Sequence, residues 1–342
     1  MRVGLLGCGA VVRFCHLPAL ERIRDVRVVA AADPDPAALD RACGIARRHL
    51  ATYARADDLL AREDVDAVVI SVPTHLHADV AVAAIAAGKH VYLEKPIAAS
   101  AADARRVAEA AQAAGVVGAI GFNRRSHPLY EQARALLRSG RIGRVHAVQS
   151  VFAELAHDMP AWKRARCTGG GVLLDLASHH VDLVRWFLDD EVAEATASVA
   201  SHVTEQDSAH VHLVMRGGAT VQSFFSFRAE LADSLEFFGE RGTLRVDRHR
   251  LRLTLSVARR FGYGARLSWV PPTSAIAASR LRRLVRPGED PSYRRALRAF
   301  ALAVRGGTAT LPSMGDGVRS LDVVMAAEES ARTGSSIRLA TS

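Results

Sequence analysis

Residues 1–12 read MRVGLLGCGAVV, an apolar run that passes directly into a Gly-x-Gly turn. Gly7 permits a tight turn from a strand into a helix, and Gly9 lets the backbone approach a diphosphate at the helix N-terminus. The third glycine of this fingerprint is replaced by Val12, so the motif is weak in isolation. Its place between a predicted first strand and a predicted helix favours a dinucleotide-binding domain.

The first third of the chain alternates short apolar runs with alanine-rich helical stretches. The predicted strands are residues 3–6, 28–32, 67–70, 90–93 and 117–120, and the clearest helices are residues 36–49 and 78–87. Strict alternation of strand and helix predicts a parallel sheet covered on both faces. We therefore expect an α/β, doubly wound Rossmann domain over residues 1–121.

The pattern changes after Gly121. Helices are predicted over residues 128–139, 174–188, 292–305 and 315–333, a strand over residues 145–153, and hairpins with period-2 alternation over residues 194–257. Gly217-Gly218 and Arg241-Gly242 fit the turns of such hairpins. The pattern predicts an α+β domain over residues 122–342 with a large, mostly antiparallel open sheet.

Length and composition limit the class of protein. The 342 residues exceed one ordinary core and favour two domains. With 49% hydrophobic and 24% charged residues the chain has a globular profile, and no apolar segment reaches the ~18 residues of a membrane helix. The N-terminal run is too short and glycine-rich for a signal peptide. The four cysteines lack paired or zinc-site spacing, which predicts core thiols in a reducing, cytoplasmic compartment.

The net charge of +9 comes almost wholly from arginine, because the chain has only three lysines, Lys89, Lys95 and Lys163. Between Arg248 and Arg298 there are thirteen arginines against two acids. This arginine-rich segment has two interpretations: a solvated face, or a site for anionic groups such as the diphosphate of a nucleotide sugar. No nucleic-acid-binding module accompanies the charge, so nucleic acid is not an expected partner.

Several residues at strand ends are candidates for binding a dinucleotide. Asp33 ends the second strand, where an acid would bind the adenosine ribose hydroxyls and repel a 2′-phosphate. This favours NAD over NADP, although Asp33 also suits a turn before Pro34. His77 has two open roles, a ligand contact or the first turn of the next helix. The full set of predicted cofactor-binding residues is Gly7, Gly9, Ala10, Val11, Val12, Asp33, Ser71, Pro73, Thr74, His77, Glu94 and Lys95.

Lys95 lies in the triplet Glu94-Lys95-Pro96, directly after a predicted strand. Ligands of a doubly wound sheet bind outside the carboxyl ends of its strands, so this lysine should face the same cleft. Its ammonium can hydrogen-bond a ribose hydroxyl and a substrate oxygen, and desolvation would lower its pKa toward the range of proton exchange. A surface charge is the simpler alternative for a lysine at a strand end.

The stretch from Gly169 to Asp182 carries the strongest chemical signal. Three glycines allow close backbone approach, and Asp175 and His179 then lie four residues apart on one helix face. An acid in this position can tune the basicity of a histidine, so His179 is a candidate general base for an alcohol proton. His180 lies off this face and is predicted to pack or hydrogen-bond. An Asp-x-x-x-His pair can also ligate a metal, but no third ligand is evident, and no metal is predicted.

Together these features resemble the Gfo/Idh/MocA family, the glucose-fructose oxidoreductase and inositol dehydrogenase group. The resembling segments cover nearly the whole chain: Gly7-x-Gly9 with residues 16–20, Asp33, Pro73-Thr74-x-x-His77, residues 88–91, Glu94-Lys95-Pro96, residues 121–125, residues 169–182 and residues 312–317. The resemblance implies that Lys95, Asp175 and His179 are the catalytic lysine, aspartate and histidine. It also implies homodimers or homotetramers formed through the C-terminal sheet.

The resemblance further implies an NAD(P)-dependent exchange of hydride with a secondary alcohol or ketone on a sugar, cyclitol or nucleotide-linked sugar. The expected substrate-binding residues are Asn123, Arg124, Trp162, Lys163, Asp175 and His179, with Trp162 either stacking on a sugar or serving as a buried anchor. Two other functions use the same residues or fold: a redox-assisted sugar hydrolase or lyase that retains NAD, and a non-catalytic NAD-bound sensor. A sensor has no need of a proton relay, which argues against it.

Overall fold

The computed structural model describes residues 1–155, 159–258, 265–285 and 290–340. The chain forms two compact units. Unit 1 contains residues 1–123, 167–169 and 289–321, and unit 2 contains residues 124–166, 170–288 and 322–342. The sequence predicted two consecutive domains, and the structure differs because two later segments return to unit 1.

Unit 1 is built on a six-stranded parallel sheet with the strand order β3-β2-β1-β4-β5-β6. Its strands are β1 (Arg2–Leu6), β2 (Arg27–Ala32), β3 (Ala51–Tyr53), β4 (Ala67–Ile70), β5 (His90–Leu93) and β6 (Gly118–Ile120). All four residues of β4 are buried, as expected for a strand covered on both faces. The strand order is that of a Rossmann domain, which confirms the predicted fold.

Short helices connect these strands. They are η1 (Val12–His16), α1 (Leu17–Leu20), α2 (Pro36–Ile45), α3 (Ala56–Leu60), η2 (Thr74–Leu76), α4 (His77–Ala86) and α5 (Ala101–Ala114). Local capping fixes several boundaries: the Ser100 side chain accepts a hydrogen bond from Asp103 N at the start of α5, and Gly115 ends α5 with a φ of 63°. The edge strand β3 was not predicted, because its three residues form no apolar run.

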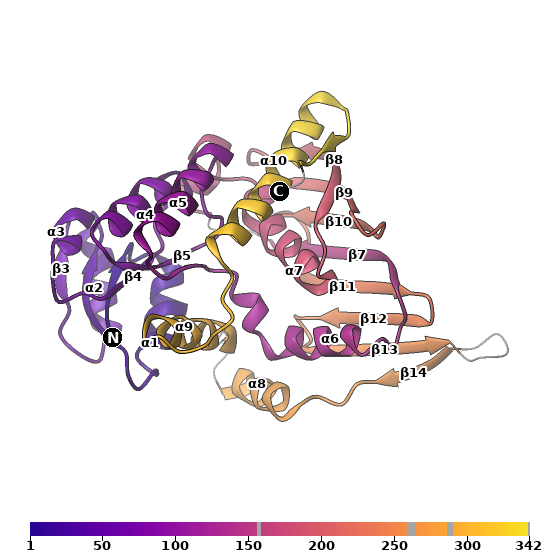
Figure 1. The fold of residues 1–342 in the computed structure, drawn as a ribbon, viewed down its shortest axis with the longest axis horizontal. Coiled ribbons are helices and arrows are strands. Elements are labelled where there is room, and N and C mark those ends of the chain that lie inside the picture. Colours follow the sequence, from indigo (N-terminus) through magenta and orange to yellow (C-terminus); the bar gives the residue numbers. More distant parts are fainter. Residues whose placement is uncertain (156–158, 259–264, 286–289, 341–342) are drawn as a thin grey trace. The chain divides into compact units, whose positions relative to one another are not determined.

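A helix from late in the sequence completes the core of unit 1. Helix α9 (Pro291–Val304) begins at a cap in which the Asp290 side chain accepts from Ser292 N. It packs against α1 (Figure 1). The Phe300 ring meets the Tyr92 ring of β5 at a centroid distance of 5.7 Å. The sequence predicted this helix but assigned it to the second domain, because its amphipathic pattern does not say which core its apolar face joins.

Unit 2 is built on a nine-stranded sheet with the order β14-β13-β12-β11-β7-β10-β9-β8-β15. Its strands are β7 (Val145–Ala153), β8 (Val192–Ala200), β9 (Ser208–Met215), β10 (Thr220–Ser226), β11 (Ala232–Gly239), β12 (Gly242–Asp247), β13 (Arg252–Ala258), β14 (Ala265–Trp269) and β15 (Ile337–Arg338). The pair β7–β10 is parallel, and the other neighbours are antiparallel. The predicted large, mostly antiparallel sheet is confirmed.

Helices cover one face of this sheet. Helix α6 (Pro128–Arg138) packs on β12 and β13, and helix α7 (Ser178–Leu188) packs on β7 (Figure 1). The remaining helical segments are η3 (Asn123–Ser126), η4 (Ala161–Lys163), η5 (Arg166–Thr168), η6 (Leu173–Ala177), α8 (Ser274–Val285) and α10 (Met314–Thr333). Within the described residues, none of the helices combines the length and apolarity needed to cross a membrane.

Candidate active site

The glycine loop of unit 1 has the geometry that its sequence predicts. Gly7 adopts a φ of 88°, and a Cβ added to it would lie 2.4 Å from the carbonyl oxygen of Ser71. Any side chain at this position would collide with the end of β4. A Cβ added to Gly9 would meet no protein atom within 4 Å. The space beside Gly9, at the start of a helix, is therefore open to a ligand.

The residues after Gly9 explain why valine replaces the third glycine. Ala10 and Val11 are exposed, whereas Val12 is fully buried in the core of unit 1. The Val12 side chain thus packs in the core of unit 1. Cys8, between the two glycines, is also buried, and burial raises the pKa of its thiol to about 12. Cys8 is a core thiol, as predicted, but the prediction was wrong for Cys167, which is exposed, and Cys15 and Cys43 are only partly buried.

Asp33 is held at the end of β2 beside the glycine loop. Its Oδ2 accepts a hydrogen bond from Cys8 N at 2.7 Å, and its Oδ1 accepts one from Asp35 N at 2.9 Å. An ionised carboxylate has about four acceptor sites, so two remain for the hydroxyls of a ribose. The glycine loop and Asp33 together fit the diphosphate and adenosine ribose of a nicotinamide dinucleotide.

The loop after β4 serves mainly to hold unit 1 together. Ser71 and Pro73 are partly exposed, whereas Thr74 is buried against Gly169. His77 begins α4, and its Nδ1 and Nε2 lie 2.7 Å and 3.0 Å from the carbonyl oxygens of Pro96 and Val72. Burial lowers the pKa of His77. Of its two open roles, the structure shows the helix start, with both ring nitrogens directed at backbone.

Lys95 interrupts a buried run at the end of β5. Among residues 91–98 it is the one residue that is not buried. The preceding Glu94 is buried, and its Oε1 lies 2.7 Å from His16 Nε2. Glu94, a predicted cofactor-binding residue, therefore directs its carboxylate at a protein partner.

Asp175 and His179 interrupt a second buried run, in unit 2. Among residues 169–185 these two are the residues that are not buried. Asp175 lies in the π-helical turn η6, and His179 lies in the first turn of α7, which continues it. The Lys163 ammonium donates to Asp175 Oδ2 at 2.7 Å and lies 5.5 Å from the centre of the Trp162 ring. Unit 2 thus brings Trp162, Lys163 and Asp175 together, with His179 four residues further along the same helical segment.

Each glycine before this helix is required by a close contact. A Cβ on Gly169, Gly170 or Gly171 would lie 2.4 Å from Thr74 Cβ, 2.3 Å from Lys163 O or 2.9 Å from Gln206 Oε1, respectively. The close approach predicted from the three glycines is real, and the atoms approached belong to the protein. No group of three acidic, histidine or cysteine side chains in the described ranges is placed to hold a metal ion.

Two predicted substrate-binding residues have structural contacts instead. The Asn123 side chain is buried and its Nδ2 donates to Ser292 Oγ at 2.8 Å. Arg124 is also buried, with an ion pair of 3.0 Å to Asp233 and its guanidinium 4.1 Å from the centre of the Phe152 ring. Both side chains have little surface left for a substrate. The sequence could not reveal this, because their partners lie far along the chain.

His180 belongs to a buried polar network that the sequence did not reveal. Its Nδ1 lies 2.7 Å from Ser150 Oγ of β7, and its Nε2 lies 3.1 Å from Asp233 Oδ1 of β11. Ser150, His180 and Asp233 are each at most 3% exposed. A Ser–His–Asp set closed to solvent cannot attack a substrate, so its role is structural. The predicted hydrogen-bonding role of His180 is confirmed.

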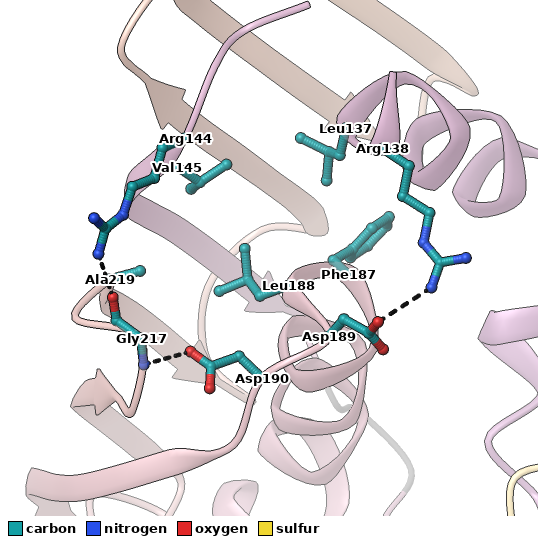
Figure 2. Close-up of a pocket in the computed structure, with 10 residues that line it drawn as sticks. All are labelled: Leu137, Arg138, Arg144, Val145, Phe187, Leu188, Asp189, Asp190, Gly217 and Ala219. Atoms are coloured by element: carbon teal, nitrogen blue, oxygen red, sulfur yellow. Dashed lines mark hydrogen bonds and ion pairs between the residues drawn. The ribbon is translucent and has the colours of Figure 1, made fainter. Parts of the chain in front are cut away.

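A cavity of about 340 Å³ opens in unit 2 at the C-terminal end of α7 (Figure 2). It is lined by Leu137, Arg138, Arg144, Val145, Phe187, Leu188, Asp189, Asp190, Gly217 and Ala219. Its arginines have partners: Arg144 Nη2 donates to Gly217 O at 2.6 Å, and Arg138 pairs with Asp189 at 3.4 Å. Asp175 and His179 precede or begin α7, so the cavity lies at the other end of that helix from them.

A Rossmann sheet with a fitting glycine loop, in one chain with an α+β unit that carries a partly exposed aspartate and histidine, defines a dinucleotide-dependent oxidoreductase. Comparison with known proteins supports this class. Residues 1–122 match the model described as the oxidoreductase family, NAD-binding Rossmann fold, and residues 130–245 match the GFO/IDH/MocA C-terminal domain. The chain belongs to the Gfo/Idh/MocA family, which confirms the predicted family and its NAD-binding domain.

Three similar proteins illustrate the range of the family. The chain is 31% identical to 1,5-anhydro-D-fructose reductase of Ensifer adhaerens, over 83% of each chain. It is 29% identical to dTDP-3,4-didehydro-2,6-dideoxy-alpha-D-glucose 3-reductase of Saccharopolyspora spinosa, over 90% of this chain and 89% of that one. An oxidoreductase domain protein from Kribbella flavida has a similar structure, with a TM-score of 0.87, 25% identity and 99% of each chain covered.

Proposed function

We propose that the protein transfers a hydride between NAD and a secondary alcohol or ketone on a sugar, cyclitol or nucleotide-linked sugar. The observation that carries this proposal is the partial exposure of Lys95, Asp175 and His179. These residues break runs that are otherwise buried, and each is a type that can exchange or position a proton. The relatives named for reactions on an anhydro-sugar and a nucleotide-linked sugar support the substrate class.

In this proposal unit 1 holds the cofactor. Backbone N–H groups after Gly9 receive the diphosphate, Asp33 accepts from the adenosine ribose hydroxyls, and the loop after β4 lies along the nicotinamide half. The Asp33 carboxylate would repel a 2′-phosphate, which favours NAD over NADP. The remaining proposed contacts are those of Gly7, Ala10, Val11, Ser71, Pro73, Thr74 and Lys95, whereas the buried side chains of Val12, His77 and Glu94 contact protein atoms instead.

The proposed chemistry divides between hydride and proton. NAD supplies the hydride acceptor when it is bound. The Lys95 ammonium donates a hydrogen bond to the substrate oxygen, which stabilises negative charge as the C–H bond breaks. His179 takes the hydroxyl proton as the carbonyl forms, and Asp175 orients His179 and stabilises its protonated form. In the reverse direction His179 returns the proton to the new hydroxyl.

Trp162 and Lys163 are the proposed substrate contacts around Asp175. The flat Trp162 ring offers a face on which a sugar can stack, and Lys163 can donate to a hydroxyl or an anionic group. The arginine-rich segment is a weaker candidate. Arg248 pairs with Asp233 and Arg250 pairs with Asp247, and the two units divide the segment between them. Parts of it lie outside the described residues.

We also propose a cytoplasmic homodimer or homotetramer that associates through the nine-stranded sheet. Support comes from the packing of α6 and α7 on this sheet, and in the proposed assembly a second copy packs on the opposite face. Sedimentation velocity on the full chain tests the assembly, and a purely monomeric protein at micromolar concentration would contradict it.

The decisive experiment measures NADH formation, and then NADPH formation, from a panel of cyclitols, free sugars and nucleotide sugars. Lys95→Ala should remove nearly all turnover, about a thousandfold, because charge stabilisation at the substrate oxygen is lost. Lys89→Ala is the matched control in the same unit, where the Lys89 ammonium donates to Arg62 O at 2.6 Å. It should retain activity per folded molecule.

Other outcomes separate the competing functions. Equal turnover in Lys95→Ala and wild type would refute the lysine assignment. NAD binding without net NADH formation, combined with release of a sugar fragment, would instead identify a redox-assisted hydrolase or lyase. NAD binding with no turnover of any panel member would identify a sensor. Dependence of KM on salt for charged substrates alone would assign the arginine-rich segment to an anionic group.

A further inference from the structure

A buried acid–histidine pair lies directly behind the proposed catalytic lysine. Glu94 directly follows β5, and its backbone N–H donates to Ile70 O, at the end of the neighbouring strand β4, at 2.9 Å. This bond fixes the position of the Glu94 backbone. Its Oε1 lies 2.7 Å from His16 Nε2, and its Oε2 accepts from the backbone N of Lys95 at 3.1 Å. The His16 side chain is fully buried, and that of Glu94 is 12% exposed. One carboxylate thus contacts both the helix after the glycine loop and the lysine backbone.

The Glu94 carboxylate and the His16 ring are closely packed by their neighbours. Gly121 follows β6, and a Cβ added there would lie 3.0 Å from both Cδ and Oε2 of Glu94. Contacts of that length require the carboxylate to move. The His16 ring is held between two tyrosine rings, with centroid distances of 5.7 Å to Tyr92 and 5.2 Å to Tyr293. Neither the acid nor the histidine can change position without repacking its neighbours.

The charges nearby keep Glu94 ionised. Burial opposes ionisation, but the hydrogen bond and charge of His16, together with the charge and N–H of Lys95, outweigh it and lower the pKa of Glu94. Burial raises the pKa of Tyr92 and of Tyr293, so both rings stay neutral. His77, which also interacts with Glu94 and Lys95, stays neutral because burial lowers its pKa. The negative charge of Glu94 therefore acts on His16 and Lys95.

We propose that Glu94, held by His16, is a positioning residue that fixes the backbone of Lys95 and stabilises its ammonium. The pair connects η1, which follows the glycine loop, to the strand end that carries the lysine. This inference rests on the proposed function, because it assigns Lys95 the catalytic role. Glu94 then affects the reaction through Lys95 and does not contact the cofactor itself.

The test titrates Lys95 without any substrate. Reductive ¹³C-methylation labels the amino groups of the chain, and its three lysines give a simple NMR spectrum that Lys89→Arg and Lys163→Arg variants assign. In Glu94→Gln the amide oxygen can still accept from Lys95 N, but the charge is gone. The Lys95 titration midpoint should fall by about 1 pH unit, because a nearby opposite charge is removed. The Lys89 and Lys163 midpoints should not move.

Two further variants separate charge from structure. Gly121→Ala should displace the Glu94 carboxylate without removing it, and it should also lower the titration midpoint of Lys95. Glu109→Gln, a matched loss of charge at an exposed position of α5, should leave the midpoint unchanged because solvent screens it. An unchanged Lys95 midpoint in both Glu94→Gln and Gly121→Ala would overturn the proposal.

Kinetics then distinguish positioning from cofactor contact. In Glu94→Gln, kcat at saturating NAD should fall about tenfold, while KM for NAD stays within about twofold. A raised KM for NAD with kcat restored at saturation would overturn the proposal and assign Glu94 to the cofactor. A wild-type protein that turns over no substrate would refute the proposed function, yet the lysine titration would still decide the role of Glu94.

Discussion

Both units place a proposed catalytic residue next in sequence to a buried histidine–carboxylate pair. In unit 1 Glu94 pairs with His16 and is followed by Lys95. In unit 2 His180 pairs with Asp233 and is preceded by His179. In each case the proposed catalytic residue is partly exposed, whereas its sequence neighbour is buried. Burial of one residue thereby fixes the backbone of the other.

The two pairs differ in how their charge is neutralised. Asp233 lies 3.0 Å from Arg124 and 3.2 Å from Arg248. Burial opposes its ionisation, but the charges of these arginines and the bond to His180 lower the pKa of Asp233 far below its usual range. With two cations present already, His180 stays neutral, donates from Nε2 to Asp233 and accepts from Ser150 at Nδ1. The Glu94 charge instead acts on Lys95, the proposed catalytic lysine. The network of unit 2 therefore contributes to stability, whereas the proposed role of the pair in unit 1 is to position Lys95.

The largest expected effect comes from removing the charge of Asp233. Asp233→Asn should lower the free energy of unfolding of unit 2 by about 3–5 kcal/mol, because it leaves the buried Arg124 guanidinium without its counter-charge. Denaturant titration followed by tryptophan fluorescence measures this, since all three tryptophans, Trp162, Trp186 and Trp269, belong to unit 2.

Asp189→Asn is the matched control for that substitution. Asp189 pairs with Arg138 at 3.4 Å, but its side chain is 75% exposed. Its loss should change the free energy of unfolding by less than about 0.5 kcal/mol. Similar losses of unfolding free energy in the two variants would show that the Asp233 network stabilises unit 2 no more than a surface ion pair does.

The next effect tests the proton assignment within the network. In Ser150→Ala the Nδ1 atom of His180 loses its donor and remains buried, so unit 2 should lose about 1–3 kcal/mol. Ser198→Ala, at an exposed position of β8, should be nearly neutral. If Ser150→Ala is also neutral, His180 does not accept from Ser150.

Local patterns predicted much of this protein, and distant contacts account for what they missed. The strand predicted over residues 145–153 matches the bounds of β7, and the motifs around Lys95, Asp175 and His179 identified the residues that break the buried runs. His16 lies 78 residues from its partner Glu94, and Asp233 lies 53 residues from its partner His180. No local sequence pattern predicts such distant pairings. For the same reason Asn123 and Arg124 were predicted to bind substrate, although tertiary contacts bury both.

Each unit also has a buried neutral histidine that should make stability depend on pH. Burial lowers the pKa of His77 in unit 1 and of His180 in unit 2 below the usual histidine value of about 6.5. The unfolded chain then binds protons first on acidification, so stability present above pH 6.5 is lost as the pH falls through 6.5 toward the folded pKa. One such histidine contributes about 1.4 kcal/mol for each unit of pKa difference.

Denaturant titrations between pH 7.5 and 5.5 measure this loss. The fluorescence transition of unit 2 should shift to lower denaturant concentration as the pH falls. His180→Gln should flatten this dependence and also lower stability at pH 7.5, whereas His90→Gln in unit 1 should leave the dependence of unit 2 unchanged. Stability of wild-type unit 2 that is constant or rises on acidification would contradict the neutral state of His180.

The smallest expected effect concerns the partly exposed pair of Lys163 and Asp175, whose side chains are 29% and 15% exposed. Solvent screens this pair, so Lys163→Met should change the free energy of unfolding by less than about 1 kcal/mol. If Lys163 orients Asp175, kcat should fall about fivefold, equivalent to about 1 kcal/mol, with KM for the sugar unchanged. The exposed neighbour provides the control, because Arg164→Met removes the same charge one residue away. A raised KM for the sugar at constant kcat would instead show that Lys163 binds the substrate directly. In unit 2 the substrate would then contact the Lys163–Asp175 ion pair itself, whereas the buried His180–Asp233 pair would have no part in binding it.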